Sequence, residues 1–215
     1  MNAKVWVPVS VVAVIIAFVA ATQLFRKEEK VATVARVQEN EASLVREHAP
    51  TLGTPGGVVL VEFFDPECES CRVFHPYTKQ LLQEFEGKLQ IVFRYAPFHH
   101  NSRQAIKILE AARMQNKYFE TLDVLFEHQP EWGSHHDPKP ELMWNFIAKV
   151  KGLNVEQVRR DAESPAIEQT IRLDVSDGQA LGVRMTPSFF VNGEPLTQFG
   201  YDHLRALIEK HMKTP

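Results

Sequence analysis

Cysteine is scarce in this chain, which has only Cys68 and Cys71 among its 215 residues. With no other cysteines, a single chain can build neither a further structural disulfide nor a four-cysteine zinc site. Excess positive charge is also missing: the formal net charge is −3, so the composition carries no signature of nucleic-acid binding. The length and the 44% hydrophobic content leave room for one globular domain of ordinary size and a further segment at one end.

The two cysteines follow an apolar run, VVLVEFF, that predicts a strand over Val58–Phe64. A helix is expected to begin at the cysteines, where unpaired backbone N–H groups and the positive end of the helix dipole lower the pKa of Cys68. Cys71 lies one turn further in, so we expect it to be more shielded and to act as the resolving thiol. Two residues between two cysteines are therefore typical of a redox pair, although a metal site shared between two chains stays open.

One carboxylate, Glu62, interrupts the apolar strand. Because the run is apolar on both faces, the strand is expected to be covered on both sides. Burial of an unpaired carboxylate raises its pKa, which makes Glu62 a candidate proton acceptor for a nearby thiol. The alternative is a solvent-facing residue at a strand edge.

The N-terminal segment has no charged residue from Val5 to Phe25, a length that can enter a bilayer. Residues 1–25 are therefore predicted to form a signal anchor or a cleaved signal peptide, and the spanning length favours the anchor. Arg26, Lys27 and Lys30 follow the segment, so the positive-inside count does not favour an exported domain. A membrane-targeting segment before a lone cysteine pair nevertheless fits an oxidising compartment.

The rest of the chain is predicted to contain a helical spacer over 26–50 and a domain over 51–215, separated by a cluster of Pro and Gly residues. Further strands are expected at Leu89–Tyr95 and Pro187–Val191, with a tight turn after the second of these. Residues 102–181 show helical patterns, and Tyr201–Lys213 predicts a closing amphipathic helix. The expected fold class is an α/β core with a helical insertion.

Three motifs carry a resemblance to a known family: LVEFFDPECESC, the proline at position 76, and VRMTPSFFVNG. From about Thr51 to its end, the chain resembles the DsbA-like thiol-disulfide oxidoreductases of bacterial cell envelopes, which have the thioredoxin fold. The resemblance implies that Cys68 is the nucleophile, that Cys71 resolves, and that Glu62 is the buried acid. It implies no cofactor, protein thiols as substrates, and a redox partner in the membrane.

The same resemblance implies a substrate-binding region. A cis peptide bond between Thr186 and Pro187 would face the cysteines and pair with the backbone of an extended substrate. Glu69 and Ser70, which separate the cysteines, complete the predicted substrate-binding set. The domain is expected on the periplasmic side of the inner membrane, anchored by residues 5–25, or free in the periplasm if that segment is cleaved.

The chain departs from DsbA, which has Pro and His between its cysteines. Here Glu69 and Ser70 take those places and Glu67 precedes Cys68. Nearby carboxylates disfavour a thiolate, so we predict a less depressed Cys68 pKa and a milder oxidant, an isomerase or a reductase. The alternative function is a copper- or zinc-binding protein that uses Cys68, Cys71 and His75.

Overall fold

A computed structural model describes residues 43–213 of the chain. The predictions for residues 1–25 and for most of the 26–50 spacer lie outside the described residues. Within 43–213, no helix is both long and apolar enough to span a bilayer.

Five strands form one mixed sheet in the order β1-β3-β2-β4-β5. Their bounds are Thr51–Gly53 for β1, Val58–Phe64 for β2, Leu89–Tyr95 for β3, Ser188–Val191 for β4 and Glu194–Pro195 for β5. The central strands β2 and β3 are parallel, and the remaining pairs are antiparallel. The central strands are mostly apolar because helices cover both faces of the sheet, as the sequence predicted. Strand β1 is too short to be recognised from its sequence.

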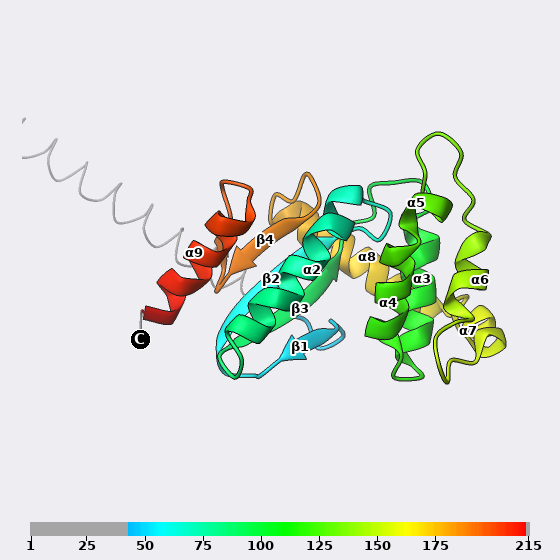
Figure 1. Cartoon of the computed structure of the whole chain (residues 1–215), viewed down its shortest axis with the longest axis horizontal. Coiled ribbons are helices and arrows are strands. Elements are labelled where there is room, and N and C mark those ends of the chain that lie inside the picture. The colour runs from blue at the N-terminus through cyan, green and yellow to red at the C-terminus, as the bar shows by residue number, and fades with distance from the viewer. Residues whose placement is uncertain (1–42, 214–215) are drawn as a thin grey trace, which may run out of the picture. The chain divides into compact units, whose positions relative to one another are not determined.

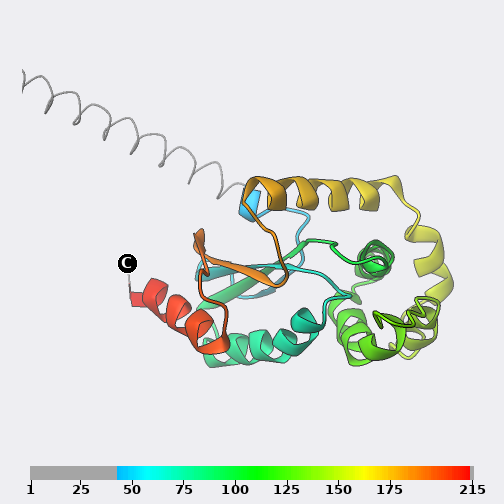
Figure 2. The ribbon, with the colours of Figure 1, turned by 90° about the horizontal axis from the view of Figure 1, so that it is seen from above.

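The faces of the sheet are covered by different helices (Figures 1 and 2). Helices α2 (Glu69–Glu84) and α9 (Tyr201–Lys213) cover one face, and α8 (Pro165–Ala180) covers the other. Because side chains alternate along a strand, Leu60 and Phe64 of β2 belong to the core beneath α2, whereas Val61 and Phe63 belong to the core beneath α8. Glu62 shares the parity of Leu60 and Phe64, so its position in the strand directs it toward the face that α2 covers.

The helical insertion is confirmed and lies at one end of the sheet (Figure 1). Its helices are α3 Ser102–Arg113, α4 Tyr118–Glu127, α5 Gln129–Trp132, α6 Leu142–Ile147 and α7 Val155–Asp161, which lead into α8. Helices α3 and α4 are separate elements because the chain turns at Asn116, whose φ is 57°. Trp132 closes the insertion: it is fully buried and its Nε1 donates to the carbonyl of Leu125 at 2.8 Å.

Residues 43–50 pack onto the face of the sheet that α8 covers. Arg94 of β3 is fully buried there, with Nη2 2.6 Å from Oδ2 of Asp177 and Nε 3.0 Å from Oδ1 of Asp174. Its Nη1 also donates to the carbonyl of Leu44 at 2.8 Å. A buried guanidinium requires such partners, and they attach this segment to the sheet. These residues belong to the compact unit, which begins at Ser43. The domain boundary at residue 51 stays a prediction.

Candidate active site

The two cysteines lie at the start of α2, as the sequence predicted. Cys68 is the N-cap, with extended backbone at φ −76° and ψ 122°, and Cys71 lies in the first turn of the helix. The Cys68 side chain keeps slight exposure, whereas Cys71 is fully buried. Its Sγ accepts a hydrogen bond from the backbone N–H of Asp65 at 3.4 Å. The thiol that can meet a substrate is thus the first of the pair.

The segment before β4 brings a backbone carbonyl to the outer cysteine. The peptide bond between Thr186 and Pro187 is cis, as predicted, and Sγ of Cys68 lies 3.3 Å from the carbonyl oxygen of Thr186. Met185, just before it, is 66% exposed. The fold therefore places a partly open stretch of backbone beside the outer thiol. Glu69 and Ser70 are exposed next to it on α2.

The two thiols differ strongly in acidity. The pKa of Cys68 is lowered to about 5, chiefly by the hydrogen bond from the Cys71 thiol. Burial opposes this shift, while hydrogen bonding by Thr186 and by the backbone N–H groups of Cys71 and Ser70 adds to it. The pKa of Cys71 is raised well above its usual value, first by burial and then by its hydrogen bond to Cys68. At neutral pH the pair is therefore a thiolate beside a protonated thiol.

Glu62 is almost completely buried, at 3% exposure, on the side of the sheet that carries the cysteines. Burial, and then the charge of Cys68, raises the pKa of this carboxyl to about 8. Among the described residues, its Oε2 is the buried side-chain polar atom without a hydrogen-bond partner. The charge of Glu62 also contributes to the raised pKa of Cys71. The edge-strand alternative for Glu62 is therefore excluded, and the carboxyl is protonated at neutral pH.

The two carboxylates that the sequence placed beside Cys68 each have a partner of their own. Glu67 is buried and accepts hydrogen bonds from the backbone N–H of Asn101 at 2.6 Å and from its Nδ2 at 2.8 Å. Glu69 is exposed and its Oε2 lies 3.1 Å from Nε2 of His135. These partners partly compensate the two negative charges, and the Cys68 thiolate, which the Cys71 thiol stabilises most, is more stable than the sequence argument implied.

Sequence reasoning missed a second pair beside the cysteines, Asp65 and His99. Asp65 is fully buried, and its Oδ2 lies 2.8 Å from Nδ1 of His99. Asp65 directly follows β2, and His99 lies in the loop after β3. The carboxyl ends of neighbouring parallel strands lie at the same edge of a sheet. A prediction that β2 and β3 pair in parallel would therefore have placed Asp65 and His99 close together.

The family described as Thioredoxin matches residues 47–210, which is most of the chain.

The chain belongs to the thioredoxin family.

Within this family, one similar solved structure is a thioredoxin-like oxidoreductase from Silicibacter pomeroyi DSS-3, with 29% identity, a TM-score of 0.69, and coverage of 80% of this chain and 98% of that one. The probable disulfide bond formation protein D of Bacillus anthracis is 29% identical over 184 residues, which are 80% of this chain and 79% of the relative. The predicted resemblance to DsbA-like proteins is thereby confirmed. A Na(+)/H(+) antiporter NhaA of Herminiimonas arsenicoxydans is 32% identical over 139 residues, 65% of this chain, but the match spans only 21% of that much longer protein.

The alternative metal site is not assembled in this thioredoxin-family chain. Nε2 of His75 lies 2.6 Å from Oδ1 of Asp123, and the His75 ring packs on Phe126 with the ring centroids 5.0 Å apart. Within residues 43–213, no three His, Cys, Asp or Glu side chains are placed to hold a metal ion. The spacing of Cys68, Cys71 and His75 suggested a metal site, but an aspartate from α4 holds the imidazole instead.

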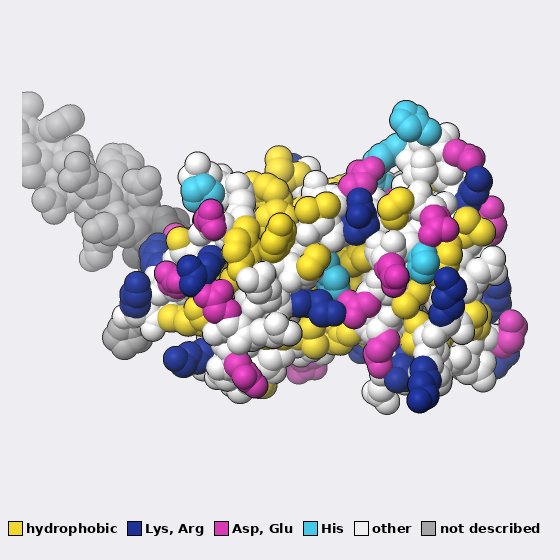
Figure 3. All heavy atoms as spheres, viewed as in Figure 1, with side chains coloured by type: hydrophobic (Ala, Val, Ile, Leu, Met, Phe, Trp, Pro, Cys, Tyr) yellow, Lys and Arg dark blue, Asp and Glu magenta, His cyan; other side chains and the backbone are white. Residues whose placement is uncertain are grey.

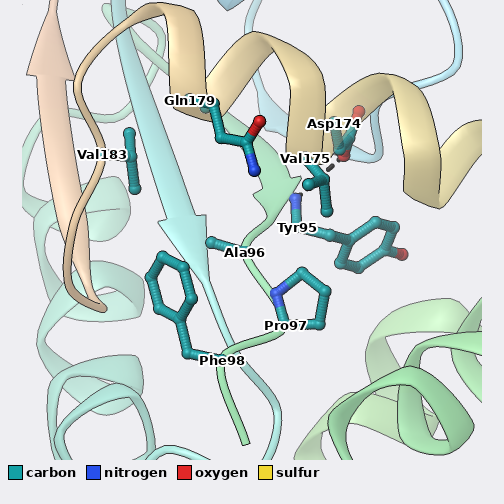
Figure 4. Close-up of a pocket in the computed structure, with 9 residues that line it drawn as sticks. Tyr95, Ala96, Pro97, Phe98, Asp174, Val175, Gln179 and Val183 are labelled. Atoms are coloured by element: carbon teal, nitrogen blue, oxygen red, sulfur yellow. Dashed lines mark hydrogen bonds between the residues drawn. The ribbon is translucent and has the colours of Figure 1, made fainter.

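Two surface features surround the site. Apolar side chains gather over the region of α2 and β4 in Figure 3. The exposed large apolar residues include Val73, Tyr77 and Phe199. On the other face of the sheet, a cavity of about 140 Å³ lies between the end of β3 and α8 (Figure 4). Phe98 lines this cavity, and the next residue along the chain is His99. One loop of the thioredoxin-family domain therefore contributes to both the cavity and the cysteine site.

Proposed function

We propose that this protein is a thiol-disulfide oxidoreductase that exchanges disulfides with protein thiols through Cys68 and Cys71. The observation that carries the proposal is the division of acidity within the pair, with the Cys68 pKa at about 5 and the Cys71 pKa raised well above its usual value. A slightly exposed thiolate and a buried thiol at one helix start are what disulfide exchange requires. The names of the similar proteins from Silicibacter and Bacillus agree with this activity.

In the oxidising direction, a substrate thiolate attacks Sγ of Cys68 in the Cys68–Cys71 disulfide. The bond between the two cysteines breaks, a mixed disulfide forms, and Cys71 leaves as a thiolate that takes up a proton. A second substrate thiolate then attacks the substrate sulfur and releases Cys68 as a thiolate. The substrate loses two electrons and gains a disulfide, and the enzyme gains those electrons. The reducing direction reverses these steps, with Cys68 attacking and Cys71 resolving.

Glu62 is proposed to move the proton of Cys71. Its carboxyl is protonated at neutral pH because its pKa is about 8, so it can donate a proton when Cys71 leaves. In the reverse direction, the carboxylate accepts the proton of Cys71 before that thiol attacks. A buried group whose pKa lies near the working pH is suited to both transfers. The unpartnered Oε2 supports this role because no other side chain engages it.

Substrate is proposed to bind along the backbone at Thr186 and Pro187, with Glu69 and Ser70 at its side. An extended peptide that pairs with this backbone would bring its sulfur to Cys68, because the Thr186 carbonyl lies 3.3 Å from that sulfur. Both intervening residues of the cysteine motif are exposed, so they are positioned to contact the same peptide.

The proposed strength of the oxidant is intermediate. A Cys68 pKa of about 5 lies between the values of about 3.5 in DsbA and about 7 in thioredoxin. Since a more stable thiolate makes the disulfide more oxidising, we propose a disulfide donor milder than DsbA. The isomerase and reductase roles stay predictions, which the reduction potential distinguishes. We further propose an envelope location, residues 5–25 as a membrane anchor, and a membrane protein as redox partner.

The chain's lack of other cysteines makes the test direct. Wild-type protein should reduce insulin with dithiothreitol and reactivate scrambled ribonuclease, and Cys68→Ser should abolish both activities. Cys71→Ser should instead accumulate mixed disulfides, because the resolving thiol is lost while the nucleophile is kept. Equal activity of the Cys68→Ser variant and the wild type would refute the proposed function.

A further inference from the structure

The loop after β3 carries an imidazole to the start of α2. Asp65 fixes this loop through one carboxylate oxygen, Oδ2, which accepts from the backbone N–H of Phe98 at 2.7 Å and from that of His99 at 3.1 Å. The same oxygen lies 2.8 Å from Nδ1 of the His99 ring. Because the backbone N–H of Asp65 also donates to Cys71, a single residue connects the imidazole to the cysteine pair.

A second contact confines the ring from the opposite side of the motif. The His99 ring lies 5.4 Å, between centroids, from the ring of His135, and His135 is paired with Glu69. Asp65 precedes Cys68 by three positions and Glu69 follows it by one. The partners of the imidazole are therefore connected to residues on both sides of Cys68 in the sequence. The His99 side chain is 27% exposed, so it lies at the partly open surface of the site.

The charges that face His99 are mostly negative. The segment before α2 supplies Asp65, Glu67 and, at the N-cap, the Cys68 thiolate. Helix α2 itself supplies Glu69. The other titratable neighbour is His135, from the loop between α5 and α6. The hydrogen bond to Asp65 is the largest cause of the raised pKa of His99; burial opposes it, and the charges of Asp65, Cys68 and Glu67 add to it. The imidazolium is thus the favoured form when the Cys68 thiolate is present.

We propose that His99, held by Asp65, is the cationic residue that stabilises the Cys68 thiolate, and that it takes up a proton when the disulfide is reduced. This rests on the proposed function. The residues between the cysteines, Glu69 and Ser70, carry no positive charge, so the cation comes from a loop about thirty residues further along the chain. Reduction by a substrate dithiol then yields the Cys68 thiolate, a protonated Cys71 and a protonated His99, and the substrate leaves as a disulfide.

The proposal predicts a reciprocal effect that can be measured on the wild type. The Cys68 thiolate exists in the reduced protein and not in the oxidised protein, so the pKa of His99 must be higher in the reduced form. The full-length protein in mild detergent, with His99 assigned by backbone connectivity, is titrated by NMR in both redox states. We expect a pKa higher by about one unit after reduction, the low end of the effect of a neighbouring opposite charge. The same pKa in both states would overturn the proposal.

A variant pair tests the other half of the linkage. His99→Gln removes the charge, and His100→Gln is the matched control because His100 is the adjacent exposed histidine. The rate of Cys68 alkylation by iodoacetamide is followed against pH in Cys71→Ser backgrounds. We expect the Cys68 pKa to rise by about one unit in His99→Gln, a tenfold loss of thiolate stabilisation, and to stay unchanged in His100→Gln. An unchanged Cys68 pKa in both variants would refute the role of His99 and leave the proposed function intact. The proposed function is tested separately, by whether Cys68→Ser abolishes insulin reduction.

Discussion

Protonation of Cys68 should remove most of the energy that makes this disulfide oxidising. The folded pKa of about 5 is lowered from an ordinary thiol value of 9.0, so the thiolate is stable at neutral pH and its stabilisation is lost as pH falls through 5. At pH 7 the pH is two units above the Cys68 pKa, so ionisation of the thiol stabilises the reduced state by about 2.7 kcal/mol. For a two-electron couple this is about 60 mV. Solvent screening of the partly exposed sulfur makes these values upper bounds.

The assay is the absorbance of the thiolate near 240 nm as pH falls from 9 to 3, with Cys68→Ser as the blank. We expect one transition centred near pH 5, and a reduction potential in glutathione buffer at pH 7 between about −270 mV for thioredoxin and about −120 mV for DsbA. Acid-quenched alkylation of the equilibrated protein gives that potential independently of the absorbance. A transition centred at pH 8 or above, together with a potential at or below about −270 mV, would refute the reasoning.

Four further predictions concern Glu62, the buried Arg94 network and the metal alternative. Glu62→Gln should slow the resolving step by 10²-fold or more, measured as accumulation of mixed disulfide, because the proton of Cys71 loses its carrier; an unchanged rate would exclude Glu62 from proton transfer. The folded pKa of Glu62 is raised to about 8, so the free energy of unfolding of the wild type should fall as pH rises from about 4.5 to 8, by up to about 1.4 kcal/mol per pH unit. Urea unfolding of Glu62→Gln should not show this pH dependence. Arg94→Ala should destabilise the domain by about 3 to 5 kcal/mol, since it removes the buried guanidinium that Asp174 and Asp177 share. A variant as stable as wild type would contradict this account of the network. Prolonged dialysis against EDTA should leave insulin reduction unchanged, and its loss with recovery on adding zinc or copper would favour the metal alternative.

The redox pair and its strand could be predicted from the sequence because their signals are local. A cysteine motif after an apolar run places Cys68 and Cys71 at a helix start, and one carboxylate in that run identifies Glu62 as a buried acid. The cis bond at Pro187 was predicted through the resemblance, since nothing in the residues themselves sets it apart from other prolines.

The partners of these residues could not be predicted because they depend on the pairing of distant segments. Asp65 and His99 are 34 positions apart and meet only through the parallel register of β2 and β3. The sequence shows the charges of Glu67 and Glu69 but not their hydrogen-bond partners, so the prediction from sequence overestimated how much they raise the Cys68 pKa. In the same way, the segment from Ser43 to Pro50 has the composition of a solvated spacer, and its role appears only when Arg94 is seen buried beside Asp174 and Asp177.

The two central strands each contain one charged residue, and the alternation of side chains directs them to opposite faces of the sheet. Glu62 faces the cysteines, while Arg94, one step further along the register, faces α8. For protein engineering, the sheet therefore separates most side chains beneath α8 from those beneath α2, so substitutions in the two sets should add nearly independently. The loop that carries Phe98 and His99 is the exception, because it reaches both the cavity beside α8 and the cysteine site.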